Sequence, residues 1–417
     1  MVASLDSGAA APARSTAATQ QPPLASEADR ARFMEQGYLI IRGLIPPDQL
    51  SLLRRDYERA VERFQVAQPD QWSSSAQPRL LVEQPGIIDE ANAGAAQLWF
   101  DDRLLEIAGR MLALPDPAIT EMLMSCSPMK DHGPSTWHRD IHPHDMAPLQ
   151  LLQDDLRENG PRYVQWNIPL YDDNVLWVVP GSHLRRNTAA ENHQLTLNAC
   201  VPLPGSIPVD LRAGDGVIYN NYILHWGSNY SAKLRRTIHG GHSLFTQHDQ
   251  KAPFLPHLDQ RSRDIFARWS VRADRLKNLT ECALRSAIHG DRHGYIAALD
   301  GLHPGVGEAG RLNLSCYLSK LVWQARLLTC RDLSVPAVLR TLETSTHPIT
   351  LNWGPAFAKR FTRDEVETLW QRFSWLDQRL RSTNEQFVPG FQSGPMEYRF
   401  EAPSEPTTFR QFISSWG

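Results

Sequence analysis

The spacing of apolar positions changes twice along the chain. Near the N-terminus apolar residues recur with the helical period after Pro46, which predicts a helix over about residues 47–64. A capping pattern that opens at Ser26 predicts an earlier helix, and the β-branched run over residues 37–43 predicts a short strand. Residues 1–26 are rich in Ala, Ser, Pro and Thr, and we expect them to form a disordered tail.

The middle of the chain has a different pattern. From about Pro117 to Phe245 the apolar runs are short and are divided by Pro, Gly, Asn and Asp. Regularly spaced short strands with turn signals are typical of an all-β sandwich or jelly roll. The clearest strand candidates are residues 162–170, 175–179, 216–225 and 235–245.

After about residue 250 the helical period returns. It predicts amphipathic helices over residues 312–328 and 363–381, the second of them capped by Thr362. These changes divide the chain into a tail (1–26), a β-rich domain with N-terminal helices (27–250) and a mostly helical C-terminal extension (251–417). We expect the extension to form a lid over a pocket or an oligomer interface.

Composition and charge limit the classes of binding partner that we expect. The chain has 417 residues, of which 41% are hydrophobic, enough for a sizeable core. A formal net charge of −3 gives no reason to expect nucleic acid or an anionic membrane as a partner. No apolar stretch approaches the length of a membrane helix. We therefore expect a small-molecule substrate, with a homo-oligomer formed through the C-terminal region as an open alternative to the lid.

The cysteines favour a reducing compartment. They are five in number and share no CxxC-type spacing, which argues against a disulfide framework or a structural zinc site and favours the cytoplasm. The five are Cys126, Cys200, Cys282, Cys316 and Cys330.

Candidate chemistry lies in the β-rich region. His138 and Asp140 are two residues apart, so on an extended strand both side chains leave the same face. A further imidazole, His225, follows far downstream. Two histidines and one carboxylate on one face of a metal ion form the facial triad of non-haem Fe(II) oxygenases, which leaves coordination positions open for reactants. This pattern predicts an enzyme.

Several segments occur around these residues in a fixed order. They are Gln36-Gly37-Tyr38-Leu39-Ile40-Ile41-Arg42-Gly43-Leu44, Thr136-Trp137-His138-Arg139-Asp140, Val164-Gln165-Trp166-Asn167-Ile168-Pro169-Leu170, Val179-Pro180-Gly181-Ser182-His183, Ala213-Gly214-Asp215-Gly216, Leu224-His225-Trp226-Gly227 and Leu234-Arg235-Arg236. This order resembles the phytanoyl-CoA dioxygenase (PhyH-like) family of Fe(II)- and 2-oxoglutarate-dependent oxygenases. The resemblance covers about residues 28–245.

The resemblance implies an α+β fold with a double-stranded β-helix (jelly-roll, cupin-like) core. It implies that Fe(II) binds to His138, Asp140 and His225, and that 2-oxoglutarate and O₂ are consumed as co-substrates. The default reaction is hydroxylation of an unactivated C–H bond of a small or medium metabolite, with succinate and CO₂ as co-products. Desaturation or ring closure are alternative outcomes, and the substrate itself is not specified.

An arginine after the second histidine resembles the residue that clamps the distal carboxylate of 2-oxoglutarate. A guanidinium fork suits a carboxylate because it can donate two parallel hydrogen bonds. Alignment on the preceding loop favours Arg235, whereas counting from His225 favours Arg236. Neighbouring strand residues face opposite ways, so only one can point inward, and we favour Arg235. Thr136 and Lys130 are further candidates for co-substrate contacts.

Several other residues could border the site. Four aromatic residues are candidates for the wall of the substrate pocket, although a place in the sandwich core is as good an interpretation for each: Trp137, Trp166, Tyr219 and Trp226. His142 and His144 are interpreted as loop or substrate-side residues. Gly227 departs from the family, which often has Ser or Thr at this position.

Two other functions fit the same pattern. A metal-dependent hydrolase or isomerase could use the same ligands with zinc or manganese, but would not need the arginine. A non-catalytic jelly-roll binding protein with a vestigial site would not need an intact triad.

Overall fold

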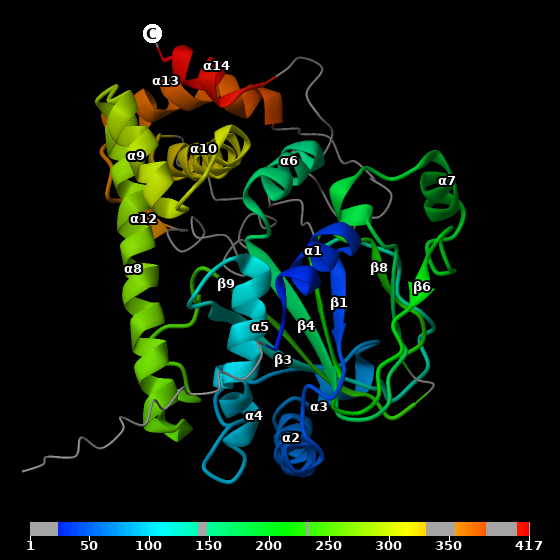
Figure 1. Cartoon of the computed structure of the whole chain (residues 1–417). Helices are drawn as coiled ribbons and strands as arrows, with labels where there is room; N and C mark the ends of the chain where they lie inside the picture. Colours follow the sequence, from blue (N-terminus) through cyan, green and yellow to red (C-terminus); the bar gives the residue numbers. More distant parts are fainter. Residues whose placement is uncertain (1–23, 141–147, 231–232, 331–354, 381–406, 417) are drawn as a thin grey trace, which may run out of the picture.

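The computed structural model describes residues 24–140, 148–230, 233–330, 355–380 and 407–416. It is a mixed α/β fold with antiparallel sheets, followed by a helical C-terminal region (Figure 1). Among the described helices, none is both long and apolar enough to cross a lipid bilayer.

The larger sheet has six antiparallel strands in the order β1-β7-β4-β9-β3-β2. Their bounds are Tyr38–Ile41 (β1), Arg79–Leu81 (β2), Ala118–Cys126 (β3), Tyr163–Pro169 (β4), Gly216–Tyr219 (β7) and Arg236–Ser243 (β9). The central strand β9 pairs with β3 on one side and with β4 on the other. The strand predicted over residues 162–170 is therefore β4, and that predicted over 235–245 is β9.

The smaller sheet has three antiparallel strands in the order β6-β5-β8. They are Leu176–Val178 (β5), Ile207–Pro208 (β6) and His225–Gly227 (β8). Apolar residues of β5 and β7 pack in one cluster, so side chains from the two sheets meet in a shared core. This arrangement places β8, which carries His225, opposite the larger sheet.

The structure corrects the prediction of one strand over residues 216–225. The run divides into β7 and β8, which belong to different sheets. The break falls at Asn220, whose side-chain oxygen accepts a hydrogen bond from the backbone N–H of Tyr222. Such a side-chain contact is typical of a turn and interrupts the apolar pattern at only one or two positions.

Helices also interrupt the region that was predicted to be all β. They are α6 (Leu149–Asn159) and α7 (Ala189–Leu197). Before this region lie α1 (Glu27–Gln36), α2 (Pro47–Ala67), α3 (Pro69–Ser74), α4 (Gly94–Gln97) and α5 (Asp102–Leu112). Ser26 caps α1 as predicted, while residues 1–23 of the predicted tail lie outside the described residues.

The C-terminal region is helical as predicted. Its helices are α8 (Gln260–Ile288), α9 (Arg292–Leu302), α10 (Glu308–Cys330), α12 (Pro355–Ala358), α13 (Arg363–Leu380) and α14 (Phe409–Ser414). The Thr362 hydroxyl accepts a hydrogen bond from the backbone N–H of Glu365, and the backbone N–H of Thr362 donates in return to the Glu365 carboxylate, which forms a capping box. All five cysteines are free.

Two large cores join at α8. One covers the outer face of the six-stranded sheet and includes residues of α2, α5 and the first half of α8. The other is built from the second half of α8 together with α6, α9, α10, α13 and α14. Figure 1 shows α8 running alongside both parts. The C-terminal region therefore shares its longest helix with the core of the β-rich part.

Candidate metal centre

His138 lies opposite His225 of β8 in an isolated β-bridge. The two residues form an antiparallel bridge in which each backbone N–H donates to the other residue's carbonyl, at 3.0 and 2.9 Å. Two residues further on, the backbone N–H of Asp140 donates to the carbonyl of Asn221 at 2.9 Å. Backbone pairing thus brings together ligand candidates that are distant in sequence.

The three side chains converge as the sequence predicts. His138 Nε2 lies 3.5 Å from Asp140 Oδ1, and His225 Nε2 lies 3.3 Å from Asp140 Oδ2. One potential ligand atom from each residue lies within 4.8 Å of the other two. Imidazole nitrogen with carboxylate oxygen is a donor set suited to Fe(II), so the residues present fit a ferrous ion.

Hydrogen bonds determine which nitrogen of each imidazole is available. Nδ1 of His138 lies 2.8 Å from the carbonyl oxygen of Thr136, and Nδ1 of His225 lies 3.0 Å from that of Ile223. A carbonyl can only accept, so in both neutral rings the proton is on Nδ1. Nε2 of each ring therefore faces Asp140. In a charged ring it carries a proton that it can donate to the carboxylate, and once that proton leaves its lone pair is free for metal ligation.

The charges in the cluster support one another. Burial by itself would raise the pKa of Asp140, but the fields of His225 and His138 and their hydrogen bonds outweigh it and hold that pKa well below its usual range. Burial would lower the pKa of His225, and the Asp140 carboxylate reverses this and raises it. The carboxylate is thus ionised and ready to bind a cation.

A cavity of about 370 Å³ opens beside the cluster. It is lined by the three candidate ligands and by side chains from the inner face of the larger sheet, among them Glu121, Tyr163, Gln165, Asn167, Tyr219, Arg235 and His239. The alternation along β4 explains this lining, because Val164, Trp166 and Ile168 point to the opposite face and join the core.

The structure separates the two neighbouring arginines. Arg235 lines the cavity and donates from Nε to Asp173 Oδ2 at 2.9 Å, and its buried Nη1 has no hydrogen-bond partner among the described residues. Arg236 does not line the cavity, and its guanidinium instead donates to the carboxylate of Glu58 at 3.0 Å. Neighbouring side chains at the start of β9 point to opposite sides, so the two arginines have different surroundings and Arg235 faces inward.

Four further residues that were predicted near the site lie outside the cavity lining. Lys130 and Thr136 are exposed and do not line the cavity; Thr136 contributes instead the carbonyl that orients His138. Trp137 and Trp166 are buried in two separate hydrophobic clusters and do not line the cavity either.

The side chains of both tryptophans leave the chain on the face opposite the cavity-lining neighbours, so alternation carries them into the core. The other two aromatic candidates, Tyr219 and Trp226, do line the cavity. His142 and His144 lie outside the described residues.

The glycine at position 227 has a local structural reason. A Cβ added to Gly227 would lie 1.9 Å from the hydroxyl oxygen of Tyr230, so the tyrosine occupies the space that a side chain would need. The ring of Tyr230 also lies beneath the Arg235 guanidinium, 5.1 Å from its carbon. Gly227 thus permits a cation–π contact that supports Arg235.

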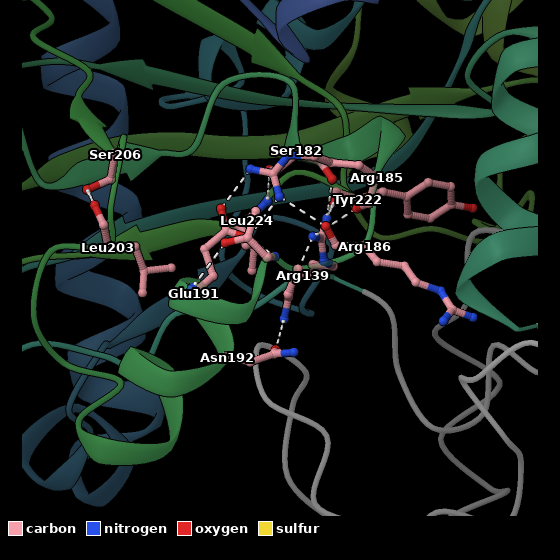
Figure 2. Close-up of polar contacts among 12 residues, drawn as sticks. Arg139, Ser182, Arg185, Arg186, Glu191, Asn192, Leu203, Ser206, Tyr222 and Leu224 are labelled. Carbon is pink, nitrogen blue, oxygen red and sulfur yellow. Dashed lines mark hydrogen bonds and ion pairs between the residues drawn. The ribbon is translucent and has the colours of Figure 1, made fainter.

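Sequence reasoning missed Arg139, which stands between two candidate ligands. Its side chain is fully buried, and burial lowers its pKa to about 9. Figure 2 shows its guanidinium beside Ser182 and Tyr222, and Nη1 donates to the backbone carbonyls of both, at 2.7 Å to Ser182. Nη2 donates to the side-chain oxygen of Asn187 at 2.8 Å. Ser182 Oγ in turn accepts from the backbone N–H of Leu224, next to His225.

Arg139 therefore ties the segment bearing His138 to the turn that leads into His225. Alternation predicts that its side chain faces away from the ligands, but an arginine at such a position is ordinarily solvated. Its burial was not readable from the sequence.

Comparison with known proteins identifies a family domain. Residues 33–237 match the family described as "Phytanoyl-CoA dioxygenase (PhyH)". This range contains the three candidate ligands and both arginines. No curated protein matches the chain significantly.

Solved structures resemble the chain more distantly. AviO1 from Streptomyces viridochromogenes Tue57 has 22% identity and a TM-score of 0.39, covering 56% of this chain and 99% of that one. EctD from S. alaskensis, solved with 2-oxoglutarate and 5-hydroxyectoine, has 14% identity and a TM-score of 0.39, covering 54% of this chain and 78% of that one. HygX from Streptomyces hygroscopicus, solved with nickel and 2-oxoglutarate, has 18% identity and a TM-score of 0.39, covering 53% of this chain and 89% of that one. With TM-scores below 0.5, these likenesses carry no weight for function.

Proposed function

Because the chain carries a phytanoyl-CoA dioxygenase (PhyH) family domain over residues 33–237, we propose that it is an Fe(II)- and 2-oxoglutarate-dependent dioxygenase. It hydroxylates an unactivated C–H bond of a small or medium metabolite and releases succinate and CO₂. The observation that carries the proposal is the convergence of His138, Asp140 and His225 in a cavity that also contains Arg235. In this proposal the two sheets, whose apolar side chains meet in a shared core, are the two layers of a double-stranded β-helix that holds the site.

The residues fit both groups that the activity requires. His138, Asp140 and His225 would hold the iron through two Nε2 atoms and a carboxylate oxygen. The unpartnered Nη1 of Arg235 is a buried donor that calls for an acceptor, and a carboxylate of 2-oxoglutarate would supply one. When bound together, ferrous iron and 2-oxoglutarate supply the oxidising power for cleavage of an unactivated C–H bond.

The protein's own contribution is to bind, orient and exclude water. Asp173 holds Nε of Arg235, so the remaining guanidinium edge keeps one direction in the cavity. Tyr219 and Trp226 are buried aromatic side chains in the lining near His225, where they limit the access of water from that side. Donors that are already held in place favour charge-assisted contacts with a bound co-substrate.

An anaerobic titration of the full chain tests the metal and co-substrate assignment. Adding Fe(II) and then 2-oxoglutarate should produce the weak visible charge-transfer band of the chelate. Asp140→Ala should weaken or abolish this band, because the variant loses one of three ligands. Turnover of a substrate without O₂ would instead favour a hydrolase or isomerase, and absence of iron binding would favour a binding protein.

The two arginines provide a matched pair of variants. Arg235→Gln should weaken 2-oxoglutarate binding by about 10- to 100-fold, because a charge-assisted hydrogen bond contributes about 1.5–3 kcal/mol. Arg236→Gln should leave that affinity within about twofold, since Arg236 pairs with Glu58 outside the cavity. Both affinities are measured from the charge-transfer band, with Fe(II) binding alone as the control for folding. Equal losses in the two variants would contradict the assignment of Arg235.

A further inference from the structure

A chain of polar side chains leads away from Asp140 into the larger sheet. Gln165 Nε2 donates to Asp140 Oδ2 at 2.9 Å and lies 3.4 Å from Nε2 of His239. On the far side of that ring, His239 Nδ1 lies 2.6 Å from Asn167 Oδ1. The chain thus runs from β4 to β9 and back to β4.

The protonation of this chain follows from its acceptors. An ionised carboxylate only accepts, so the amide nitrogen of Gln165, and not its oxygen, must face Asp140. Asn167 Oδ1 is also an acceptor, so His239 carries its proton on Nδ1 and offers the Nε2 lone pair to Gln165. Burial lowers the pKa of His239 to about 3, which keeps the ring neutral in this arrangement.

This arrangement leaves one polar atom unsatisfied. Gln165 is 5% exposed, and its Oε1 is buried without a hydrogen-bond partner in the part of the chain that the structure describes. A buried acceptor without a donor is unfavourable. The fold tolerates it at an amide that donates to the carboxylate of a candidate ligand, so stability alone does not account for glutamine here.

We propose that Gln165 is a positioning residue for the metal centre, held in orientation by His239 and Asn167, which fixes the Asp140 carboxylate for ligation. The inference rests on the proposed metal site and adds to it a role for β4 and β9. Partners that hydrogen-bond a ligating group commonly affect metal affinity by 10- to 100-fold. Nothing in the triad itself would identify this residue, because the contact depends on strand register.

Co(II), whose visible absorption reports coordination, tests the proposal in the full chain without turnover. Gln165→Met keeps the approximate volume but cannot donate, and it should weaken Co(II) binding by about 10- to 100-fold and change the absorption spectrum. His239 contacts Gln165 and not Asp140, so His239→Met should change the Co(II) affinity and the spectrum in the same direction by a smaller factor. Ile168→Val, on the opposite face of β4, controls for general loosening of the strand and should leave both unchanged.

The outcomes separate the inference from the proposed function. If the unaltered protein binds no Co(II) or Fe(II), both fail. If the unaltered protein binds the metal, two results would overturn the positioning role alone. Either Gln165→Met has the same Co(II) affinity and absorption spectrum as the unaltered protein, or Ile168→Val loses as much Co(II) affinity as Gln165→Met does. Circular dichroism of the metal-free variants establishes that they fold. Should Gln165→Met not fold, an unchanged His239→Met protein overturns the proposal in its place.

Discussion

At the residue scale, a small side chain can determine which larger side chains have room beside the cavity. Gly227 is the clearest case, because the hydroxyl of Tyr230 occupies the position where its Cβ would stand. The tyrosine is buried and lies against the guanidinium of Arg235. A single hydrogen in place of a methyl group thus determines where an aromatic ring and a cation can lie.

Gly227→Ala should therefore destabilise the protein by about 1–3 kcal/mol, because the new methyl group forces the Tyr230 ring to move. The free energy of unfolding by urea measures this. In a Tyr230→Ala background the same substitution meets open space and should cost little. A double-mutant cycle with no coupling between the two positions would contradict the explanation.

At the element scale, α8 is the connection between the two halves of the chain. Trp269 in its first half is fully buried, stacks on Phe100 with ring centres 5.2 Å apart, and donates from Nε1 to Asp116 at 3.1 Å. These contacts attach the helix to the core around α5. A domain boundary at residue 250 would separate α8 from a core to which its first half contributes. The C-terminal region is thus packed into the core of the β-rich part through α8.

Trp269→Ala should lower the free energy of unfolding by about 3–5 kcal/mol, the range for truncation of a large buried aromatic side chain. Val271→Ala on the same helix provides the control: Val271 is 68% exposed, so its change should stay within about 0.5 kcal/mol. Thermal or urea unfolding measures both. If Trp269→Ala lowered the free energy of unfolding as little as Val271→Ala does, α8 would not anchor the C-terminal region.

At the scale of the whole molecule, buried neutral histidines couple stability to pH. Burial lowers the pKa of His183 and of His242 from 6.5 to about 4. Above pH 6.5 both are neutral in the folded and the unfolded chain. Between pH 6.5 and about 4 only the unfolded chain takes up the protons, so stability is lost as the pH falls.

Acidification from pH 7 to pH 5 should therefore reduce the free energy of unfolding by about 1–2 kcal/mol for each of these histidines. Unfolding of the metal-free protein in the presence of a chelator measures this without interference from metal release. His242→Leu should show a smaller loss over the same interval, because its buried ring nitrogens are removed. An identical pH dependence in the variant would exclude His242 as a contributor.

Local patterns by themselves determined much of this protein. Period and capping residues placed α2, α10 and α13 and the caps at Ser26 and Thr362, because these signals act within one or two turns of chain. The pairing of His138 with Asp140 was readable for the same reason: alternation on an extended segment is a local property.

Tertiary structure alone decided which side of each strand faces the cavity. Alternation shows that Arg235 and Arg236 diverge, and that Gln165 and Trp166 diverge, but it does not show which side of each strand meets the metal centre. The choice depends on β9 lying between β3 and β4, and on the register of those pairs. Hydrogen bonds between strands distant in sequence set that register, so Gln165, His239 and Arg139 acquire their contacts only in the folded chain.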